Sequence, residues 1–270
     1  MLIDGSKLAQ KILDDLHLQV QNLYTKKVHP GFAVILVGNN PASIAYVKRK
    51  QKAAEKIGIT FHSYLFDNNV SEDTLFDTID LLNQDKDVHG IIIQLPLPKH
   101  LDEEKIVNRV DPEKDIDGFH PQTEFIPPIS LAVLEVLNSI DINPKDKKMV
   151  VIGRGETAGK PIANTLIQKG AKVIIIHSKT KNVPFFTKQA DIVISCVGRT
   201  NVVTPKMVHK KTILIGVGLH KGKDGKLCGD YDEEIIAKKV AFYTPTPGGM
   251  GPVNVACLLR NVVLAASNSN

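Results

Sequence analysis

Residues 149–159 read MVVIGRGETAG, in which an apolar run passes directly into three glycines, Gly153, Gly155 and Gly159. An apolar strand followed by a glycine-rich turn and a helix is typical of a dinucleotide-binding fold. The first glycine permits the tight turn, the second lets the backbone approach a pyrophosphate, and the helix amino terminus faces its negative charge. The spacing is GxGxxxG rather than GxGxxG, so an ordinary strand–turn–helix connection is the alternative. This stretch predicts a nucleotide-binding α/β unit.

The end of the next strand predicts which nucleotide binds. An NAD site usually offers an acidic residue there for the ribose hydroxyls, whereas residues 177–181 read HSKTK and contain no acid. A 2′-phosphate is repelled by a carboxylate, and it is favoured by the Ser178 hydroxyl and by nearby cations such as Arg154. We therefore expect NADP, with a solvated basic turn as the alternative for the lysines.

Working outward from this motif, the whole chain alternates between apolar strands and amphipathic helices. Strands are expected at 32–37, 59–66, 90–94, 148–153, 172–177, 191–197, 212–217 and 240–243, and helices at 6–23, 42–57, 71–82, 131–140, 157–169 and 253–266. Near-continuous apolar strands between helices indicate parallel sheets that are covered on both faces. Proline, glycine and charge accumulate at 111–121, so we expect two α/β lobes with a cleft between them.

The composition excludes several classes of protein. The chain has 270 residues, 43% hydrophobic and 23% charged, as globular proteins do. The longest apolar runs are too short to cross a bilayer, and the first ten residues lack a secretory signal. Three scattered cysteines (Cys196, Cys228 and Cys257) argue against a disulfide framework or a zinc knuckle. We expect a cytoplasmic protein with no membrane partner.

The net charge gives a weaker indication than the composition of which partners the protein binds. The formal net charge is +5, lysine supplies most of the basic side chains, and tryptophan is absent. Because arginine is the usual residue for contacting base edges, we expect no nucleic-acid partner. The positive charge is either a solvated lysine-rich surface or a mild field that attracts anionic substrates.

Four side chains in the first half are candidates for chemistry. Tyr46 and Lys50 are four residues apart and share one helical face, although a lysine there can also lie at the surface. Gln94 follows a buried strand, where open α/β sheets bind ligands. Asp117 precedes Gly118, which also fits a plain turn. The histidines lack metal-ligand spacing, and no serine elbow or phosphate-binding P-loop is present, so no metal site is expected.

Together with these residues, an ordered set of segments resembles one family, the bifunctional methylenetetrahydrofolate dehydrogenase/methenyltetrahydrofolate cyclohydrolases. The matching segments are VG at 37–38, PAS at 41–43, YVxxK at 46–50, QLPLP at 94–98, KDIDGF at 114–119, GR at 153–154, HSxT at 177–180, ADIV at 190–193, GD at 229–230 and TPxPGGxGP at 244–252. Each segment is weak alone, but the collinear set covers nearly the whole chain.

The resemblance implies a fold and a function. The implied fold has an N-terminal α/β folate-side lobe, residues 1–120, completed by a C-terminal helix at 250–270 that returns to it. A Rossmann-type NADP-binding lobe covers residues 121–249. The implied reactions are oxidation of 5,10-methylenetetrahydrofolate and hydrolysis of the methenyl product to 10-formyltetrahydrofolate, in one-carbon metabolism and purine biosynthesis. The implied partners are tetrahydrofolate one-carbon derivatives and a second copy of the chain in a homodimer.

The resemblance also assigns roles to residues. The catalytic and folate-binding set falls on Lys50, Tyr46, Gln94 and Asp117, and the folate site extends to Pro247, Gly248 and Gly249. The NADP contacts fall on Gly153, Arg154, Gly155, Ser178 and Leu219.

The chain departs from the family pattern at several positions. Gly155 replaces the usual serine, Ala158 replaces a valine, Gly216 replaces an aspartate, and the segment 122–130 is shortened. Three alternatives therefore stay open: a dehydrogenase with weak or no cyclohydrolase activity, an NAD-dependent enzyme, and a non-catalytic dinucleotide-binding regulator. Retention of all four catalytic candidates counts against the regulator.

Overall fold

The computed structural model describes residues 1–222 and 225–269 of a chain that divides into two units. One unit, called here the Lys50 unit, comprises Gln10–Pro128 and Val255–Asn270. The other, called the glycine-loop unit, comprises Met1–Ala9 and Ile129–Asn254. The last helix, from Val255 onward, therefore falls in the Lys50 unit. The sequence patterns had placed the lobe boundary at residue 120 and had not indicated that the first nine residues belong with the other unit.

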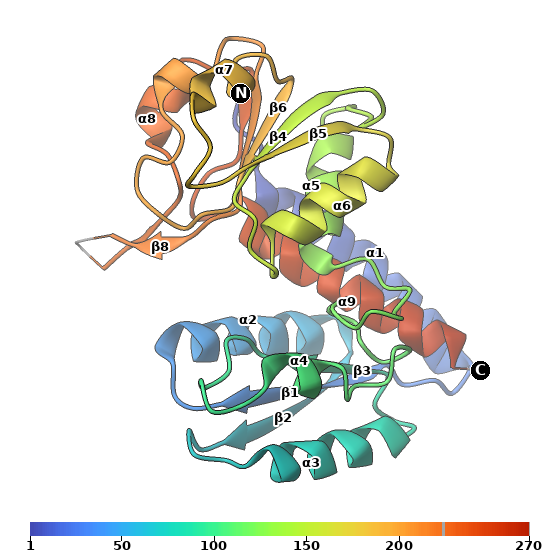
Figure 1. The fold of residues 1–270 in the computed structure, drawn as a ribbon. Coiled ribbons are helices and arrows are strands. Elements are labelled where there is room, and N and C mark those ends of the chain that lie inside the picture. Colours follow the sequence, from blue (N-terminus) through green and yellow to red (C-terminus); the bar gives the residue numbers. More distant parts are fainter. Residues whose placement is uncertain (223–224, 270) are drawn as a thin grey trace. The chain divides into compact units, whose positions relative to one another are not determined.

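The Lys50 unit is built on a three-stranded parallel sheet in the order β2-β1-β3 (Figure 1). Its strands are β1 (Gly31–Val37), β2 (Thr60–Phe66) and β3 (Gly90–Ile93), and its helices include α1 (Gly5–Thr25, from Gln10 onward), α2 (Pro41–Ile57), α3 (Glu72–Gln84), α4 (Glu103–Val107) and α9 (Met250–Asn268, from Val255 onward). The helices α2 and α3 lie on opposite faces of this sheet.

The central strand β1 explains why the sheet is covered on both faces. All seven of its residues are buried. Alternate side chains, Ala33, Ile35 and Val37, join Leu75 and Ile79 of α3 in one apolar cluster. The intervening side chains point to the other face, because side chains alternate along a strand. A continuously apolar strand between two helical layers is the arrangement expected from its sequence.

The glycine-loop unit contains a five-stranded parallel sheet in the order β10-β7-β6-β4-β5. The strands are β4 (Lys148–Ile152), β5 (Lys172–Ile176), β6 (Ile192–Ser195), β7 (Ile213–Gly216) and β10 (Phe242–Tyr243), and the longer helices are α5 (Pro128–Asn138) and α6 (Gly159–Gln168). The strands that follow β4 add first on one side of it and then on the other. The chain after β4 therefore lies at the switch point where such sheets bind nucleotides.

Short elements complete this unit. They are α7 (Val183–Thr187), α8 (Glu233–Ile236), the 3-10 turn η1 (Pro205–Met207) and the antiparallel pair β8 (His220–Lys221) and β9 (Leu227–Cys228). The sequence patterns did not predict these elements, because two to five residues are too few to show a period.

The helix α9 is the one candidate for a membrane span among the described residues, by length and composition alone. Of its most apolar window, 67% is buried inside the protein, as in the core helix of a soluble protein.

Candidate functional site

The helix α2 buries the predicted lysine. The Asn40 side chain caps the helix by accepting hydrogen bonds from two backbone N–H groups of its first turn. Lys50 lies on the inner face and is only 3% exposed, whereas Lys48, Arg49 and Lys52 are exposed. A lysine is almost never fully buried without a specific role or partner. The surface-lysine alternative therefore does not apply to Lys50.

The buried ammonium group has two close partners. Lys50 Nζ donates a hydrogen bond to Gln94 Oε1 at 3.2 Å and lies 4.9 Å from the centre of the Tyr46 ring. Gln94 directly follows β3, and its backbone N–H donates to the Ile35 carbonyl at 2.9 Å. Its side-chain Nε2 donates to the Leu95 carbonyl at 2.9 Å. These bonds orient the amide so that its oxygen faces Lys50.

Asp117 is the charged group that acts on Lys50. Burial lowers the pKa of Lys50 from its ordinary value, and the negative charge of Asp117 opposes that shift. Burial also raises the pKa of Asp117, which the positive charge of Lys50 opposes. Both shifts have the same physical cause, since burial disfavours each charged form. A lysine with a lowered pKa is neutral over a wider pH range and can therefore accept a proton and return it.

The glycine loop after β4 has the shape of a phosphate cradle. Gly153 has a φ of +112°, and a Cβ there would lie 2.7 Å from the Cys196 carbonyl oxygen. A Cβ on Gly159 would collide with the Gly153 carbonyl. Around Gly155 a Cβ would meet nothing within 4 Å. The helix α6 then begins at Gly159 without a side-chain cap. In its first turn Pro161 has no N–H and the Lys160 N–H donates to the Gly155 carbonyl at 3.1 Å, so the Gly159 N–H is the one left to face an anion. These features fit a bound pyrophosphate.

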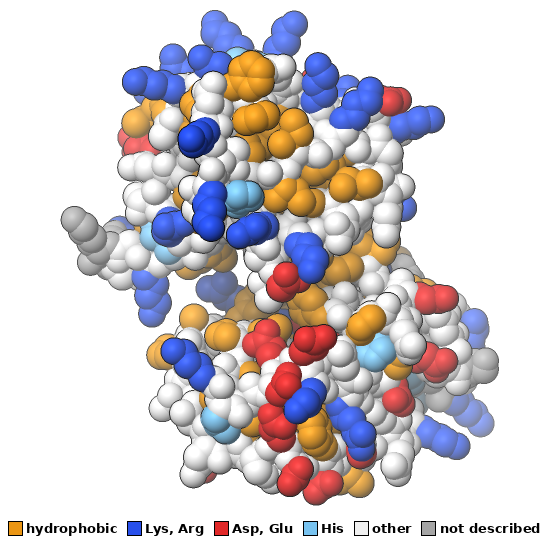
Figure 2. All heavy atoms as spheres, in the orientation of Figure 1, with side chains coloured by type: hydrophobic (Ala, Val, Ile, Leu, Met, Phe, Trp, Pro, Cys, Tyr) orange, Lys and Arg blue, Asp and Glu red, His pale blue; other side chains and the backbone are white. Residues whose placement is uncertain are grey.

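The turn after β5 is organised by its own side chains. Thr180 Oγ1 accepts a hydrogen bond from the His177 N–H at 3.1 Å, and His177 Nδ1 accepts one from the Lys179 N–H at 3.2 Å. Ser178 and Arg154 are at least partly exposed, as a contact to a nucleotide phosphate requires. Figure 2 shows lysine and arginine side chains spread over the visible face of this unit.

The loop that follows β6 is held by a buried carboxylate. Asp230 is fully buried, and its Oδ2 accepts hydrogen bonds from Ser195 Oγ at 2.6 Å and Val197 N–H at 2.9 Å. Its Oδ1 accepts from the Gly198 and Arg199 N–H groups at 2.7 and 2.9 Å. Three consecutive N–H groups thus converge on one anion. Asp230 fixes the loop at the carboxyl edge of the sheet.

The exposed Leu219 lies on a neighbouring loop of the same edge. A Cβ on Gly198 would lie 2.8 Å from the Leu219 carbonyl oxygen, so the two loops touch. Leu219 itself is 45% exposed. An exposed apolar side chain at this edge is available to a nucleotide ring.

The predicted folate segment Pro247–Gly249 lies in the glycine-loop unit. Gly248 has a φ of +94°, and its carbonyl accepts a hydrogen bond from the Ser6 N–H at 3.0 Å. Gly249 is buried, and a Cβ on Gly5 would collide with its carbonyl. The start of α1 is therefore packed on this segment.

Among residues 1–222 and 225–269, no three histidine, cysteine or acidic side chains gather as metal ligands do. Sequence reasoning did not assign a role to Asp230, to Asp115 or to Asn261, although all three are buried and hydrogen-bonded. The two aspartates do lie inside segments that carry the resemblance, KDIDGF at 114–119 and GD at 229–230, whereas Asn261 lies in none of them.

Comparison with known proteins matches both halves of the chain. The profile of the catalytic domain of tetrahydrofolate dehydrogenase/cyclohydrolase matches residues 3–117, and that of its NAD(P)-binding domain matches residues 127–270. The bifunctional protein FolD of Nautilia profundicola is 44% identical, over 99% of this chain and 97% of that protein.

Solved structures agree. The bifunctional enzyme FolD, a methylenetetrahydrofolate dehydrogenase/cyclohydrolase from Campylobacter jejuni, is similar with a TM-score of 0.96 and 39% identity, covering 99% of both chains. The Trypanosoma brucei enzyme complexed with NADP cofactor and inhibitor has a TM-score of 0.94 and 31% identity, covering 100% of this chain and 98% of that one.

Proposed function

The chain belongs to the tetrahydrofolate dehydrogenase/cyclohydrolase family, and we propose that it is a bifunctional enzyme that uses NADP. It oxidises 5,10-methylenetetrahydrofolate to 5,10-methenyltetrahydrofolate and hydrolyses that product to 10-formyltetrahydrofolate. The observation that carries this function is the buried Lys50, hydrogen-bonded to Gln94 and coupled to Asp117, in a chain that both family profiles match.

Hydrolysis needs proton transfers, which we assign to Lys50. Water attacks the methenyl carbon and loses a proton, and a ring nitrogen gains a proton when its bond to that carbon breaks. The new hydroxyl releases its own proton to solvent as the formyl C=O forms, so one proton is released overall. Neutral Lys50 accepts the proton from water, and the ammonium form returns it to the leaving nitrogen. Gln94 holds Nζ in place with the 3.2 Å hydrogen bond, and Asp117 keeps the proton affinity of Lys50 from falling too far.

The same side chains orient the folate substrate. We assign stacking on the substrate ring to Tyr46, whose ring already lies beside Lys50. The Asp117 carboxylate accepts hydrogen bonds from the N–H donors of the pterin. The resemblance assigns further folate contacts to the segment Pro247–Gly249.

The glycine-loop unit supplies the cofactor site. Bound NADP+ provides the acceptor for the hydride of the methylene group, so the protein has mainly to bind and orient it. Gly153, Gly155 and the uncapped start of α6 would hold the pyrophosphate. Ser178 and Arg154 would hold the 2′-phosphate, and Leu219 would contact a ring of the cofactor.

The test is an assay of the purified enzyme with methylenetetrahydrofolate and each nicotinamide cofactor, following reduced cofactor and methenyl absorbance separately. We expect faster turnover with NADP+ than with NAD+ at equal concentration. Equal turnover would refute the cofactor preference, and no turnover with either would support the regulator. Retained oxidation without methenyl hydrolysis would support the dehydrogenase alternative.

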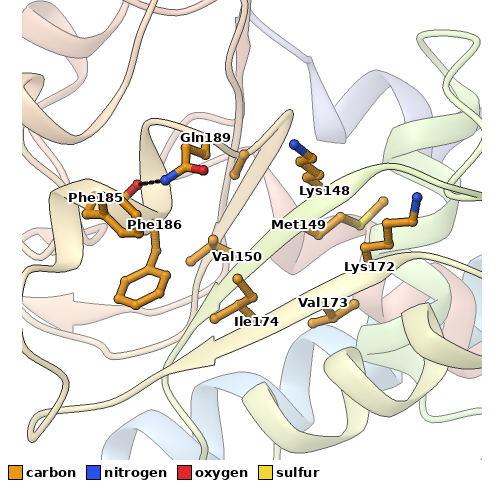
Figure 3. Close-up of a pocket in the computed structure, with 10 residues that line it drawn as sticks. Lys148, Met149, Val150, Lys172, Val173, Ile174, Phe185, Phe186 and Gln189 are labelled. Atoms are coloured by element: carbon orange, nitrogen blue, oxygen red, sulfur yellow. Dashed lines mark hydrogen bonds between the residues drawn. The ribbon is translucent and has the colours of Figure 1, made fainter.

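We further propose that the enzyme is a homodimer joined through β5. Within the described residues, β5 is the edge of its sheet and pairs only with β4. Beside it lies a groove of about 390 Å³, in which Ile174 is 46% exposed and Phe185 56% exposed. Figure 3 shows Val173, Ile174 and the two phenylalanines around this hollow. An open apolar edge invites strand pairing.

A second copy is the partner that this edge fits. Two β5 strands related by a two-fold axis would pair antiparallel and close both edges at once. The test is sedimentation of Ile174→Lys, with Ile167→Lys as the control, because Ile167 is 52% exposed but lies outside the groove. We expect a dimeric parent, a dimeric control and a monomeric Ile174→Lys. A dimeric Ile174→Lys would refute this interface.

A cytoplasmic location completes the proposal. Cys196, Cys228 and Cys257 form no disulfide, as suits a reducing compartment. Cell fractionation that recovers the activity elsewhere would contradict it.

A further inference from the structure

The turn that carries Asp117 is packed tightly on its own unit. It leaves the sheet where the Ile91 N–H donates to the Lys114 carbonyl at 2.8 Å. Gly118 has a φ of +76°, and a Cβ there would lie 2.8 Å from the Pro127 nitrogen and 2.9 Å from the Phe125 carbonyl oxygen. The turn therefore has little room to move toward the segment 125–127.

A buried carboxylate closes this turn from inside. Asp115 is 4% exposed, and its Oδ2 accepts a hydrogen bond from the His120 N–H at 2.7 Å. Its Oδ1 accepts one from the Gly118 N–H at 3.2 Å. In the sequence, Asp117 lies between Asp115, which accepts these hydrogen bonds, and the two residues that donate them. The side chain of Asp115 thus determines the curvature of the backbone that presents Asp117.

A side chain from the far end of the chain holds the turn from the other side. Asn261 lies on α9 and is 3% exposed. Its Nδ2 donates hydrogen bonds to the Ile116 carbonyl at 2.9 Å and the Ile126 carbonyl at 3.0 Å. The first of these carbonyls belongs to the peptide bond that leads into Asp117. One amide group therefore holds together the two segments of the loop that contain Ile116 and Ile126.

We propose that Asp115 and Asn261 are positioning residues that hold the Asp117 carboxylate at its working distance from Lys50. Neither side chain is assigned a contact with substrate. This inference rests on the proposed function, because it concerns how the proton-transferring lysine is tuned. It adds two residues to the site that the sequence patterns had not singled out.

The physical reason is that Asp117 acts on Lys50 through charge. Asp117 is the charged group that raises the proton affinity of Lys50, against the burial that lowers it. Asp117 also acts electrostatically on Asp115. A Coulomb interaction weakens as the charges separate, so a loosened turn shifts the pKa of Lys50 further downward. The pH dependence of hydrolysis then moves, which a purely structural role would not cause.

The experiment compares pH–rate profiles of methenyltetrahydrofolate hydrolysis for Asn261→Ala and Asp115→Asn. Controls are Asn268→Ala on the same helix and Asp111→Asn, both at exposed positions. We expect the profile of the first two to move to lower pH, with kcat reduced by about 10- to 100-fold, since small misplacements have such effects. We expect NADP affinity to stay unchanged. The two controls should match the parent.

Two further comparisons distinguish a failure of the positioning role from a failure to fold and from a failure of the proposed function. If Asn261→Ala does not fold by circular dichroism, Asn261→Ser, which retains one donor, replaces it. Lys50→Met and Asp117→Ala are assayed in parallel: parent-like hydrolysis by both would refute the proposed function itself. If those two lose activity while Asn261 and Asp115 variants keep the parent profile, only the positioning role is refuted. A lower rate with an unshifted profile would refute it as well.

Discussion

Replacing Asp230 by asparagine tests how the loop after β6 is held. The native carboxylate accepts four hydrogen bonds, two at each oxygen. Asparagine offers one oxygen, which can keep the Gly198 and Arg199 N–H groups. Its NH2 group then replaces Oδ2, where the Ser195 hydroxyl can rotate to accept from it. The Val197 N–H, however, faces another donor and loses its partner.

The cost follows from these contacts. An unsatisfied N–H costs about 1–3 kcal/mol, and here the lower half applies because this group is only partly buried. The two bonds that the asparagine oxygen would keep lose their charge assistance, at about 1 kcal/mol each. We therefore expect the free energy of unfolding to fall by about 3 kcal/mol, and Tm by about 6–12 °C.

Circular dichroism melting measures this change, since the chain has no tryptophan to report by fluorescence. The matched control is Ser195→Ala, which removes one of the four hydrogen bonds and leaves the carboxylate with its three backbone donors. We expect it to lower Tm by a third of the Asp230→Asn effect. An Asp230→Asn protein that melts within about 2 °C of the parent, less than 1 kcal/mol by the same relation, would show that the carboxylate does not hold the loop.

Three further outcomes are expected. Lys50→Met should reduce methenyl hydrolysis by about 10²–10⁴-fold in stopped-flow absorbance, with hydride transfer affected less and the exposed Lys52→Met unaffected; a parent-like rate would contradict it. Burial raises the pKa of Asp115 from 3.8 to about 6, so the folded protein takes up a proton between these values. Stability should then fall by up to about 3 kcal/mol as pH rises through this window, and Asp115→Asn should flatten Tm against pH there. Gly155→Ser has open space for its side chain and should tighten NADP+ binding about tenfold by titration calorimetry; unchanged affinity would mark the glycine as neutral.

The order of the larger helices and strands could be predicted because each has a clear apolar pattern. Strands such as β1 are buried along their whole length, so their sequences are continuously apolar. The observed ends of some elements differ from the predicted ones for local chemical reasons. The helix α5 begins at Pro128, whereas its apolar residues predicted a start at residue 131. Proline is well suited to the first position of a helix, since it has no N–H to leave unpaired.

The candidate site was predictable only in part. Lys50 and Gln94, which the resemblance assigns to one site, are joined by the hydrogen bond from Nζ to Oε1. Asp115 and Asn261 could not be found by pattern, because their contacts join residues 135 to 145 positions apart or lie within an irregular turn. No local period records such contacts. The four-residue spacing from Tyr46 had already singled out Lys50, and burial distinguishes it from the exposed Lys52.

Each unit includes residues from the opposite end of the chain, and this has a consequence for synthesis on the ribosome. The Lys50 unit needs Val255–Asn270, yet the whole of Ile129–Asn254 is translated first. At about 5–20 residues per second, roughly 6 to 25 seconds separate the two parts. During that interval the nascent Lys50 unit lacks the apolar part of α9, whose Leu258, Leu259 and Val262 are buried in the folded protein. Its apolar surface must stay shielded until the last helix has left the exit tunnel.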